Sequence, residues 1–347
     1  MPVKEPSWWY ADGQHWQTAV LTPLSHVYGA IAGGRLERAT PYRSRLPVIC
    51  VGNLTAGGTG KTPLALLLAG VLRNLGREPW FLSRGYGGRI AGPVCVDPTT
   101  HSAADVGDEP LLLATTAAAV IARNRRTGAQ FIESAAPANA VIIMDDGLQN
   151  PSLAKSFTIA VVDGGRGLGN GLVIPAGPLR APLNVQTKRT DAIIVMGQAN
   201  VAVRADIAAL QNRFGNRLLH ARSAPVGDTG WLNGANVVAF AGIANPDRFF
   251  TTLESLGARI AQRIAFADHH AFTESDAATL VSAAGRHNAT LITTEKDIAR
   301  LAGAVGTCAT LRARAKTLPV TLNFDDGDLA RLTAMIDAAV KRAAAQP

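Results

Sequence analysis

Residues 55–62 read Thr-Ala-Gly-Gly-Thr-Gly-Lys-Thr, and this stretch decides the fold class. The apolar run at 46–51 before it predicts a short buried strand, and the run at 63–72 after it predicts a helix. A glycine-rich loop that joins a strand to a helix is the context of a phosphate-binding loop, because the N–H groups of the loop and of the first helical turn face an anion. We therefore expect an α/β protein with a P-loop NTPase-like parallel sheet, helices on both faces of that sheet, and a smaller second α/β domain.

The last two residues of the loop have predictable roles. Lys61 is expected to reach the β- and γ-phosphates of a nucleotide, and the Thr62 hydroxyl is expected to ligate Mg2+. The usual pattern opens with glycine where this chain has Thr55, so the later glycines must supply the flexibility. The residues expected to bind the nucleotide are Thr55, Ala56, Gly57, Gly58, Thr59, Gly60, Lys61 and Thr62. The alternative is a glycine-rich turn that contains an incidental lysine.

An acidic pair follows another strongly apolar run. Residues 140–144 predict a buried strand, which leads directly into Asp145 and Asp146. An acidic residue at the carboxyl end of a parallel strand lies beside the phosphate loop in this class of fold, and it holds Mg2+ directly or through water. The sequence leaves open which of the two carboxylates ligates the metal directly. The alternative is a polar turn, since Asp-Gly is a common turn dipeptide.

An ordered set of short motifs adds to the loop and the acidic pair. The set comprises the segments 52–63, 83–88, 106–110, 145–149, 169–171, 175–180, 240–243, 268–270 and 293–297. In this order the motifs resemble those of the tetraacyldisaccharide 4'-kinases, the lipid A 4'-kinases of Gram-negative bacteria, over nearly the whole chain. The resemblance implies ATP and Mg2+ as cofactors. It also implies transfer of the ATP γ-phosphate to the 4'-hydroxyl of a tetraacyldisaccharide 1-phosphate, a lipid substrate, in lipopolysaccharide biosynthesis, which gives lipid IVA.

The resemblance further implies a catalytic pair. Asp108 matches the catalytic base of the family and His269 the histidine that accompanies it, with His270 as an alternative, and Lys61 completes the catalytic set. The pattern alone favours a helix N-cap for Asp108, because Glu, Pro and an apolar run follow it. With the domain boundaries given below, Asp108 and His269 belong to different domains. We therefore expect a cleft that closes around both substrates.

Further binding residues follow from the same motifs. Gln149 is expected near the nucleotide phosphates or the metal, and Arg84 and Arg180 are expected to bind substrate. Loops that follow parallel strands meet the ligand in open α/β sheets, which supports the assignment of Arg84. The family usually continues with Glu after the second arginine, where this chain has Ala181. The role of that carboxylate is therefore absent here or relocated.

The composition narrows the classes of partner. The 347 residues carry a net charge of +8, which favours an acidic partner such as anionic lipid, nucleic acid or a phosphorylated substrate. No run of Lys and Arg is interleaved with aromatic residues, so we expect no nucleic-acid partner. Cys50, Cys95 and Cys308 lack metal-binding spacing, and three scattered cysteines favour a reducing cytoplasm.

The N-terminal segment 1–45 predicts contact with a membrane. Three of the five tryptophans fall in its first 16 residues, and the stretch 13–34 has apolar residues at helical spacing and no Asp, Glu, Lys or Arg. Polar residues interrupt this stretch, so it predicts neither a membrane span nor a secretory signal. We expect an interfacial helix on an anionic membrane surface, peripheral or monotopic on the cytoplasmic face of the inner membrane. The alternative is an amphipathic helix packed on its own domain.

Apolar strands alternate with helical patterns along the rest of the chain, which predicts parallel sheets covered on both faces. Residues 46–215 are expected to form the P-loop kinase domain, and 216–235 a linker. A second series of strands and helices predicts a smaller α/β domain with a C-terminal helix at 236–347.

Three other functions compete with a kinase. A GTPase-like switch protein would use the same loop, but in the candidate guanine motif Thr294-Glu-Lys-Asp297 the lysine stands one place late. Another P-loop enzyme, such as a ligase, remains open. A membrane-associated binding protein with a vestigial loop is disfavoured by the intact Lys61, Thr62 and acidic pair.

Overall fold

The computed structural model describes residues 5–345, except for residues 12, 14, 59 and 199–202. The chain divides into two compact units, and neither is a continuous piece of sequence. Of the described residues, the larger unit contains 5–84, 122–223 and 322–345, and the smaller unit contains 85–121 and 224–321.

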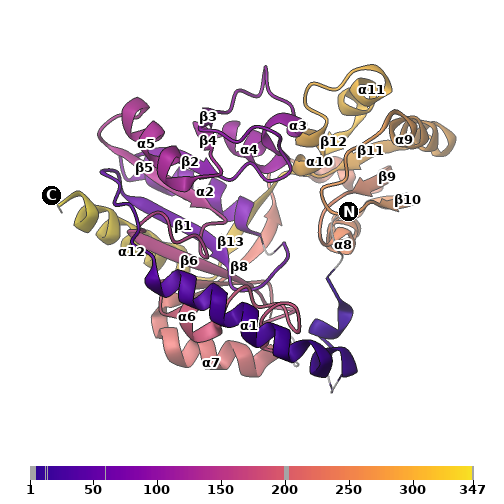
Figure 1. Ribbon diagram of the computed structural model, residues 1–347. Coiled ribbons are helices and arrows are strands. Elements are labelled where there is room, and N and C mark those ends of the chain that lie inside the picture. Colours follow the sequence, from indigo (N-terminus) through magenta and orange to yellow (C-terminus); the bar gives the residue numbers. More distant parts are fainter. Residues whose placement is uncertain (1–4, 12, 14, 59, 199–202, 346–347) are drawn as a thin grey trace. The chain divides into compact units, whose positions relative to one another are not determined.

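The larger unit is built on a mainly parallel sheet (Figure 1). Its strands run in the order β13-β8-β7-β6-β1-β5-β2. Their bounds are β1 Val48–Asn53, β2 Glu78–Ser83, β5 Ala140–Asp145, β6 Phe157–Asp163, β7 Ala192–Met196, β8 Leu218–Pro225 and β13 Val320–Phe324. β1 is parallel to both of its neighbours, β5 and β6, and all six of its residues are buried. Such continuous burial is expected of a parallel strand covered on both faces.

Helices cover both faces of this sheet. Figure 1 shows α2 and α5 on one face and α6 and α7 on the other. The helices of the unit are α1 Trp16–Arg38, α2 Lys61–Asn74, α5 Arg125–Ala135, α6 Leu183–Thr187, α7 Arg204–Phe214 and α12 Asp328–Ala344, with short 3-10 turns at Ser7–Trp9 and Gly215–Arg217. Leu210 and Phe214 of α7 join a buried cluster with Val162 and Ile193 of the sheet. The predicted α/β class with a parallel sheet is confirmed.

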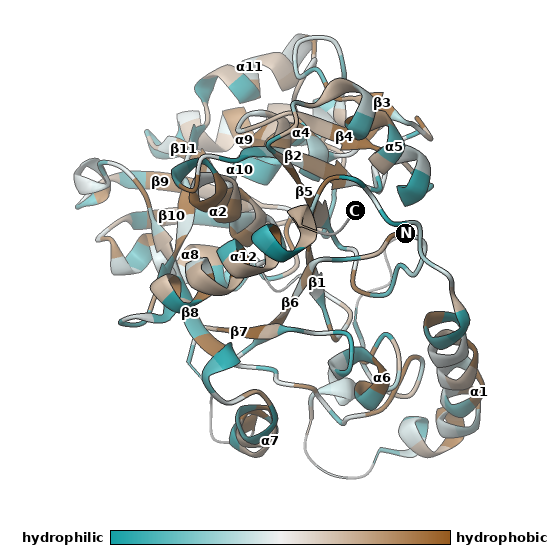
Figure 2. Ribbon diagram, turned by 90° about the vertical axis from the view of Figure 1, so that its left-hand side faces the viewer, coloured by the Kyte–Doolittle hydropathy of each residue, from teal (hydrophilic) through white to brown (hydrophobic). Residues whose placement is uncertain are grey.

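Helix α1 packs mainly through small residues and leaves most of its large apolar residues exposed. A Cβ added at Gly29 or Gly33 would lie 3.6 or 3.5 Å from the ring of Pro182, which is ordinary van der Waals contact, so this face of α1 packs directly on the residue before α6. The apolar residues of the opposite face, which are 44–72% exposed, are Trp16, Val20, Leu24, Val27, Tyr28 and Ile31. Figure 2 shows hydrophobic (brown) and hydrophilic (teal) residues interspersed along this helix. Among the described residues, α1 and every other helix fall short of the length and apolarity that crossing a bilayer requires.

The smaller unit holds a second parallel sheet, in the order β10-β9-β11-β12. The elements contributed by 224–321 are η4 Gly230–Leu232, β9 Asn236–Ala241, α8 Pro246–Ser255, β10 Arg259–Ala265, α9 Glu274–His287, β11 Thr290–Thr293, α10 Glu295–Arg300, α11 Gly306–Arg314 and β12 Lys316–Thr317. Alternate residues of β9 enter different cores. Val237 packs with Phe250 of α8, whereas Val238 packs with Leu280 of α9, so helices cover both faces.

The segment 85–121 supplies the remaining elements of the smaller unit. These are α3 Ala103–Val106, α4 Asp108–Ala114 and the strands β3 Val94–Cys95 and β4 Ala119–Ile121, which pair antiparallel. The contacts therefore divide the chain differently from the ranges 46–215 and 236–347. Residues 85–121 join the second series of elements, and 322–345 return to the larger unit. Residues 322–345 belong to the larger unit because β13 lies next to β8 in its sheet. In addition, the His220 N–H of β8 donates to the carboxylate of Asp328, the first residue of α12, at 2.7 Å.

Candidate active site

The predicted phosphate loop lies between β1 and α2 of the larger unit. Helix α2 begins at Lys61, directly after Gly60, whose φ of 91° is in the left-handed region that favours glycine. The amide of Asn53, the last residue of β1, donates to the Gly57 carbonyl at 2.9 Å. Thr62 is buried in the first turn of α2. These features reproduce the predicted strand, loop and helix, whereas Thr59 lies outside the described residues.

The segment 175–180 runs beside the start of the loop. The Ala56 N–H donates to the Pro178 carbonyl at 2.8 Å, and the Arg180 N–H donates to the Leu54 carbonyl at 3.0 Å. Thr55 is buried and bridges to Leu179. The N–H of Ala56 is therefore committed to protein. The donors that face an anion must then come from later in the loop, which narrows the set predicted to bind the nucleotide.

Lys61, Asp146 and Arg180 meet at the carboxyl end of β5. The Asp146 Oδ1 accepts from the Arg180 Nη1 at 2.7 Å and lies 3.5 Å from the Lys61 Nζ. Burial raises the pKa of Asp146, but the charges of Lys61 and Arg180 outweigh it and lower that pKa to about 2. Asp145, which ends β5, is buried beside this pair. The structure thus brings together the predicted lysine, one predicted arginine and the acidic pair.

The side chain of Gln149 is hydrogen-bonded to the end of β1 and to Gln186. Its amide nitrogen donates to the Asn53 carbonyl at 2.7 Å and to the Gln186 side-chain oxygen at 2.6 Å. Gln186 in turn donates to the carbonyls of Leu54 and Ala181 at 3.1 and 2.6 Å. The amide N–H groups of Gln149 therefore support the end of β1, the strand that carries the loop.

The structure also places Ala181 and Arg84, two further positions of the family motifs. Ala181 is fully buried with Leu36 and Val185, so the position that usually carries Glu is part of the core in this chain. Arg84 is exposed just after β2. The positive charge of Arg84 acts on Arg125, a buried residue that none of the sequence motifs contains. Burial chiefly lowers the pKa of Arg125 to about 10, Asp145 and Asp146 oppose the change, and Arg84 adds to it.

The predicted catalytic pair lies entirely within the smaller unit. The His269 Nδ1 is 3.0 Å from Oδ2 and 3.2 Å from Oδ1 of Asp108. The expectation that the two residues belong to different domains is therefore wrong, because 85–121 packs with 224–321. Asp108 is also not the N-cap. Gly107 precedes the helix with a φ of 90°, and Asp108 is the first residue of α4.

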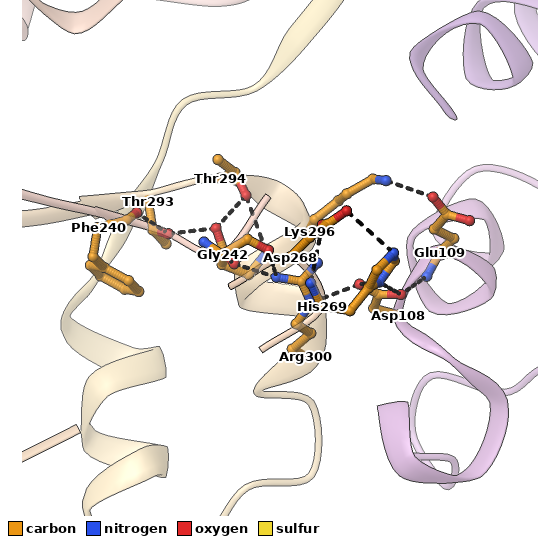
Figure 3. Close-up of polar contacts among 11 residues, drawn as sticks. Asp108, Glu109, Phe240, Gly242, Asp268, His269, Thr293, Thr294, Lys296 and Arg300 are labelled. Atoms are coloured by element: carbon orange, nitrogen blue, oxygen red, sulfur yellow. Dashed lines mark hydrogen bonds and ion pairs between the residues drawn. The ribbon is translucent and has the colours of Figure 1, made fainter. Parts of the chain in front are cut away.

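A buried arginine holds the pair in place (Figure 3). The Arg300 Nε donates to Asp108 Oδ2 at 2.7 Å, and its Nη1 donates to Asp297 Oδ1 at 2.6 Å and to the Gly242 carbonyl. Asp297 is fully buried and also accepts from the hydroxyls of Thr293 and Thr294. Arg300 thereby ties the start of α4 to the ends of β9 and β11.

The two members of the pair have opposite pKa shifts. Burial alone would raise the pKa of Asp108, but the hydrogen bond with His269 and the charges of Arg300, His269 and Lys296 hold it well below its usual range. The hydrogen bond with Asp108 raises the pKa of His269, burial opposes this, and the charge of Asp108 adds to it. The Asp108 side chain is 6% exposed and that of His269 is 30% exposed. Histidine is therefore the accessible and titratable end of the pair.

The surroundings of His269 are polar and constrained. Its φ of 57° is unusual for a residue with a side chain, and such strain, of roughly 1–3 kcal/mol, concentrates at functional sites. Asp268 Oδ2 lies 3.9 Å from its Nε2, and the Tyr86 ring packs edge-on against the imidazole. His270 points elsewhere: its Nε2 lies 3.0 Å from Asp276 Oδ2, and its ring stacks on Phe266. The structure places His269, and not His270, beside Asp108.

Arg300 and Lys296 are site residues that the sequence analysis did not identify. Lys296 Nζ donates to Glu109 Oε1 at 2.6 Å, so α10 and α4 are linked by a second ion pair. Lys296 lies within the motif at 293–297 and Arg300 three residues after its end, so the two are about one helical turn apart. The motif at 293–297 was the only sequence feature that pointed to these two residues. Its spacing does not show that they contact α4. The same geometry excludes Asp297 as a residue that binds guanine, because its carboxylate is buried and accepts hydrogen bonds from protein donors.

Comparisons with known proteins identify the family of the chain. A family model described as "Tetraacyldisaccharide-1-P 4'-kinase" matches residues 17–341. A "Tetraacyldisaccharide 4'-kinase" of Nitrobacter winogradskyi is 49% identical over 93% of this chain and 94% of its own length. Its counterpart in Methylobacterium nodulans is 48% identical over 97% and 96%.

A solved structure matches in fold. A crystal structure of LpxK from Aquifex aeolicus in complex with ATP is similar with a TM-score of 0.72 over 93% of this chain and 99% of that chain, at 23% identity. The motifs, the strand–loop–helix and these relatives all lead to one assignment: the chain belongs to the tetraacyldisaccharide-1-P 4'-kinase family.

Proposed function

We propose that this chain transfers the γ-phosphate of ATP to the 4'-hydroxyl of a tetraacyldisaccharide 1-phosphate in lipid A biosynthesis, giving lipid IVA. One observation carries the proposal beyond family membership: Lys61 opens α2 beside Asp146 and Arg180, at the carboxyl end of the strand next to the loop. This is the place where a P-loop enzyme holds the phosphates and the metal. ATP as the donor is further supported by the ATP complex of the Aquifex relative.

The larger unit supplies groups suited to Mg2+ and phosphate. We assign the Thr62 hydroxyl and the Asp145 carboxylate to Mg2+, which commonly takes one or two protein oxygens and completes its shell with water and phosphate. Bound there, the metal would neutralise charge on the phosphates. Asp146 has a different role in this proposal, because its Oδ1 already accepts from Arg180 and faces Lys61. It orients these two cations toward the phosphates.

The smaller unit supplies the proton acceptor. Both oxygens of Asp108 accept hydrogen bonds, from the Glu109 N–H and Arg300 Nε as well as from His269, and the carboxylate is almost fully buried. The Nδ1–H of His269 donates to this anion, which leaves Nε2 as the acceptor of the neutral ring. We therefore assign proton acceptance from the 4'-hydroxyl to His269 Nε2. Asp108 orients the ring and stabilises its cation, so the pair acts as a base through its histidine.

Helix α1 is proposed to bind an anionic membrane surface on the cytoplasmic face of the inner membrane. Its exposed face carries a tryptophan, a tyrosine and four aliphatic residues, and Arg35 and Arg38 lie in its last turn. An apolar face flanked by basic residues is typical of an interfacial helix. A lipid substrate with long acyl chains makes such contact useful, because it brings the enzyme to the surface in which the substrate resides.

A direct assay tests the reaction. The purified chain, labelled ATP and the tetraacyldisaccharide 1-phosphate are combined in detergent micelles with Mg2+, and the lipid product is separated. A labelled, doubly phosphorylated lipid is expected, and none is expected with a disaccharide that lacks the 4'-hydroxyl. Label released as free phosphate, with no lipid product, would favour a nucleotide switch protein and would overturn the kinase proposal.

A further inference from the structure

An acidic side chain from the start of the chain lies against the phosphate loop. A Cβ added at Gly57 would collide with Glu5 Oε1 and would lie 3.0 Å from Glu5 Cδ, so the carboxyl group packs directly on the backbone of the loop. The side chain of Glu5 is only 23% exposed. Both residues belong to the larger unit, and the site described above gives Glu5 no role.

Glu5 lies at the ligand-binding edge of the parallel sheet. Its Oε2 accepts from the Arg166 Nη1 at 2.9 Å. Arg166 follows β6 and Gly57 follows β1, and these two strands are parallel neighbours. Ligands of open parallel sheets bind outside the carboxyl ends of the strands. A carboxylate that contacts the loops after both strands therefore lies where the phosphates of a nucleotide are expected.

Two side chains hold this carboxylate. Arg166 forms the ion pair with it, and the Arg166 guanidinium lies 5.2 Å from the centroid of the Tyr10 ring. Burial chiefly raises the pKa of Tyr10. The charge of Glu5 adds to the increase, the charge of Arg166 opposes it, and a hydrogen bond with Glu5 adds to it again. The phenol is therefore protonated at neutral pH and donates to the carboxylate.

The backbone that carries Glu5 is also fixed. Trp9 is 8% exposed, and its Nε1 donates to the Pro175 carbonyl at 3.1 Å. The Trp9 carbonyl accepts from the Asn170 N–H at 2.8 Å. Pro175 begins the segment 175–180 that runs beside the start of the loop. Residues 5–10 are thereby attached to the same loops that surround the expected phosphate site.

A carboxylate in this place competes with phosphate. The N–H groups of the loop and of the first turn of α2 favour an anion, and a glutamate carboxylate meets that preference as a phosphate oxygen does. A second anion beside it would be repelled. Because Glu5 belongs to the same chain, it competes at an effective concentration on the order of millimolar, without any cost of association from solution.

We propose that Glu5 is an internal competitor of the nucleotide: its carboxylate covers the phosphate loop and must leave before the phosphates bind. Arg166 and Tyr10 hold it in the covering position. The loop then binds nucleotide only in the fraction of molecules from which Glu5 is withdrawn, and the affinity for ATP is reduced by that fraction. The proposal rests on the proposed function in one respect, the assignment of residues 55–62 to phosphate.

The affinities of Glu5 variants test the proposal. Dissociation constants of ATP and of tripolyphosphate, which lacks a nucleoside, are measured on the full chain with Mg2+ by titration calorimetry. Glu5→Gln should lower both constants about three- to tenfold, because a loop covered in roughly 70–90% of the molecules binds weaker by that factor. Glu37→Gln is the matched control. It removes the same charge from an exposed position of α1 and should leave both constants unchanged.

Two variants that conserve charge separate coverage of the loop from the charge of Glu5 alone. Glu5→Asp keeps the carboxylate but withdraws it by one methylene group, and Tyr10→Phe removes only the hydroxyl that donates to it. Both should tighten the binding of ATP and of tripolyphosphate about twofold or more. Tyr10→Phe should add nothing in the Glu5→Gln background, because the two residues act through one contact. Thermal unfolding of each variant checks that the fold is intact.

Three results distinguish this proposal from its competitors. Unchanged or weaker binding of ATP by Glu5→Gln would make Glu5 a structural residue or a ligand of the nucleotide, and the proposal would be wrong. Tighter binding by Glu5→Gln, with no change in Glu5→Asp and Tyr10→Phe, would reduce the effect to local charge and would also overturn it. A wild-type chain that phosphorylates no lipid but shows the expected order of affinities would overturn the kinase reaction and leave the role of Glu5 standing.

Discussion

Two carboxylates of the candidate site are surrounded by cations, and this decides what each can do. Asp146 faces Lys61 and Arg180, and Asp108 faces Arg300 and His269. In both, the neighbouring positive charges outweigh the effect of burial, so both pKa values fall and both groups are anions at neutral pH. A carboxylate held in this state is a weak proton acceptor. His269 has a raised pKa, so its neutral imidazole is a stronger base than an ordinary histidine.

The pH dependence of kcat follows from this assignment. His269 must be neutral to accept a proton, so activity should rise with pH through the pKa of His269, which lies above its ordinary value of about 6.5. Asp108→Asn removes the first cause of the raised pKa, so the acidic limb should move to lower pH while kcat falls about 100-fold or more. Rates measured from about pH 5 to 9 give both results. A wild-type profile that is flat over this range would instead favour Asp108 as the base.

Coupling between the two residues provides an independent measurement. Adding His269→Ala to Asp108→Asn should cost much less than the product of the two single losses, because residues that act as one unit are non-additive. ATP affinity should be retained in all three variants, since the phosphate loop belongs to the larger unit. Strictly multiplicative losses in kcat would show that the two residues act independently.

Lys61→Ala should abolish most activity. The substitution removes the charge that would offset negative charge on the transferred group, and a fall in kcat on the order of 100-fold or more is expected. It also takes one of two cations from Asp146, so the pKa of that carboxyl should rise from about 2. Arg73→Ala, at the far end of the same helix, is the control. Near-normal turnover of Lys61→Ala in the lipid assay would remove the loop from the mechanism.

At the scale of elements, the apolar pattern of the sequence predicted the strands whose side chains are buried. The strands expected at 46–51 and 140–144 are found at Val48–Asn53 and Ala140–Asp145, because each is a continuous apolar run. Helix α5 was missed because its sequence is mostly polar; the Asn124 side chain caps it and Arg125 is buried in its first turn. Strand β8 was missed because His220 and Arg222 interrupt its apolar pattern.

Helix α1 permits a test of membrane contact by one face only. Replacing Trp16, Leu24 and Ile31 with Ser removes exposed apolar area and should release the chain from vesicles that contain anionic lipid, with ATP affinity unchanged. The control places Ser at Ala19, His26 and Ala30, which are exposed positions of the same helix. Co-sedimentation at low and high salt measures binding. Equal sedimentation of both triple variants would exclude the apolar face as the cause, and loss of cooperative unfolding in the first would mean that this face is core.

At the scale of the whole molecule, the sequence predicted the fold class but not the partition of the chain. A reader of the sequence assumes that neighbouring elements share a domain, which holds for most connections. Here 85–121 leaves the P-loop series after β2, and 322–345 leave the second series before α12. The contacts responsible are long in sequence: Arg300 to Asp108, and Asp328 to His220. Neither contact leaves a periodic signal in the sequence. Asp108 and His269 could therefore be identified as a pair from the motifs, but their location within one unit could not be predicted.

This partition predicts which fragments fold. Residues 236–347 alone should fold poorly, because they lack Leu232 of one core and Asp108, the partner of the buried Arg300. They also carry α12, whose apolar residues are buried in the larger unit. Residues 85–121 joined to 224–321 by a flexible linker should unfold cooperatively and show dispersed amide resonances.

The titration of His269 makes the test specific to the candidate site. In the joined fragment its imidazole should keep a raised pKa by NMR, because Asp108 and Arg300 are both present. Asp108→Asn in that fragment should lower the pKa toward its ordinary value without unfolding it, since this change keeps the size of the side chain. An unshifted His269 in a folded joined fragment would show that the pair requires the larger unit. Cooperative unfolding of 236–347 alone would show that α4 is dispensable to the smaller core, and the partition proposed for the chain would then be wrong.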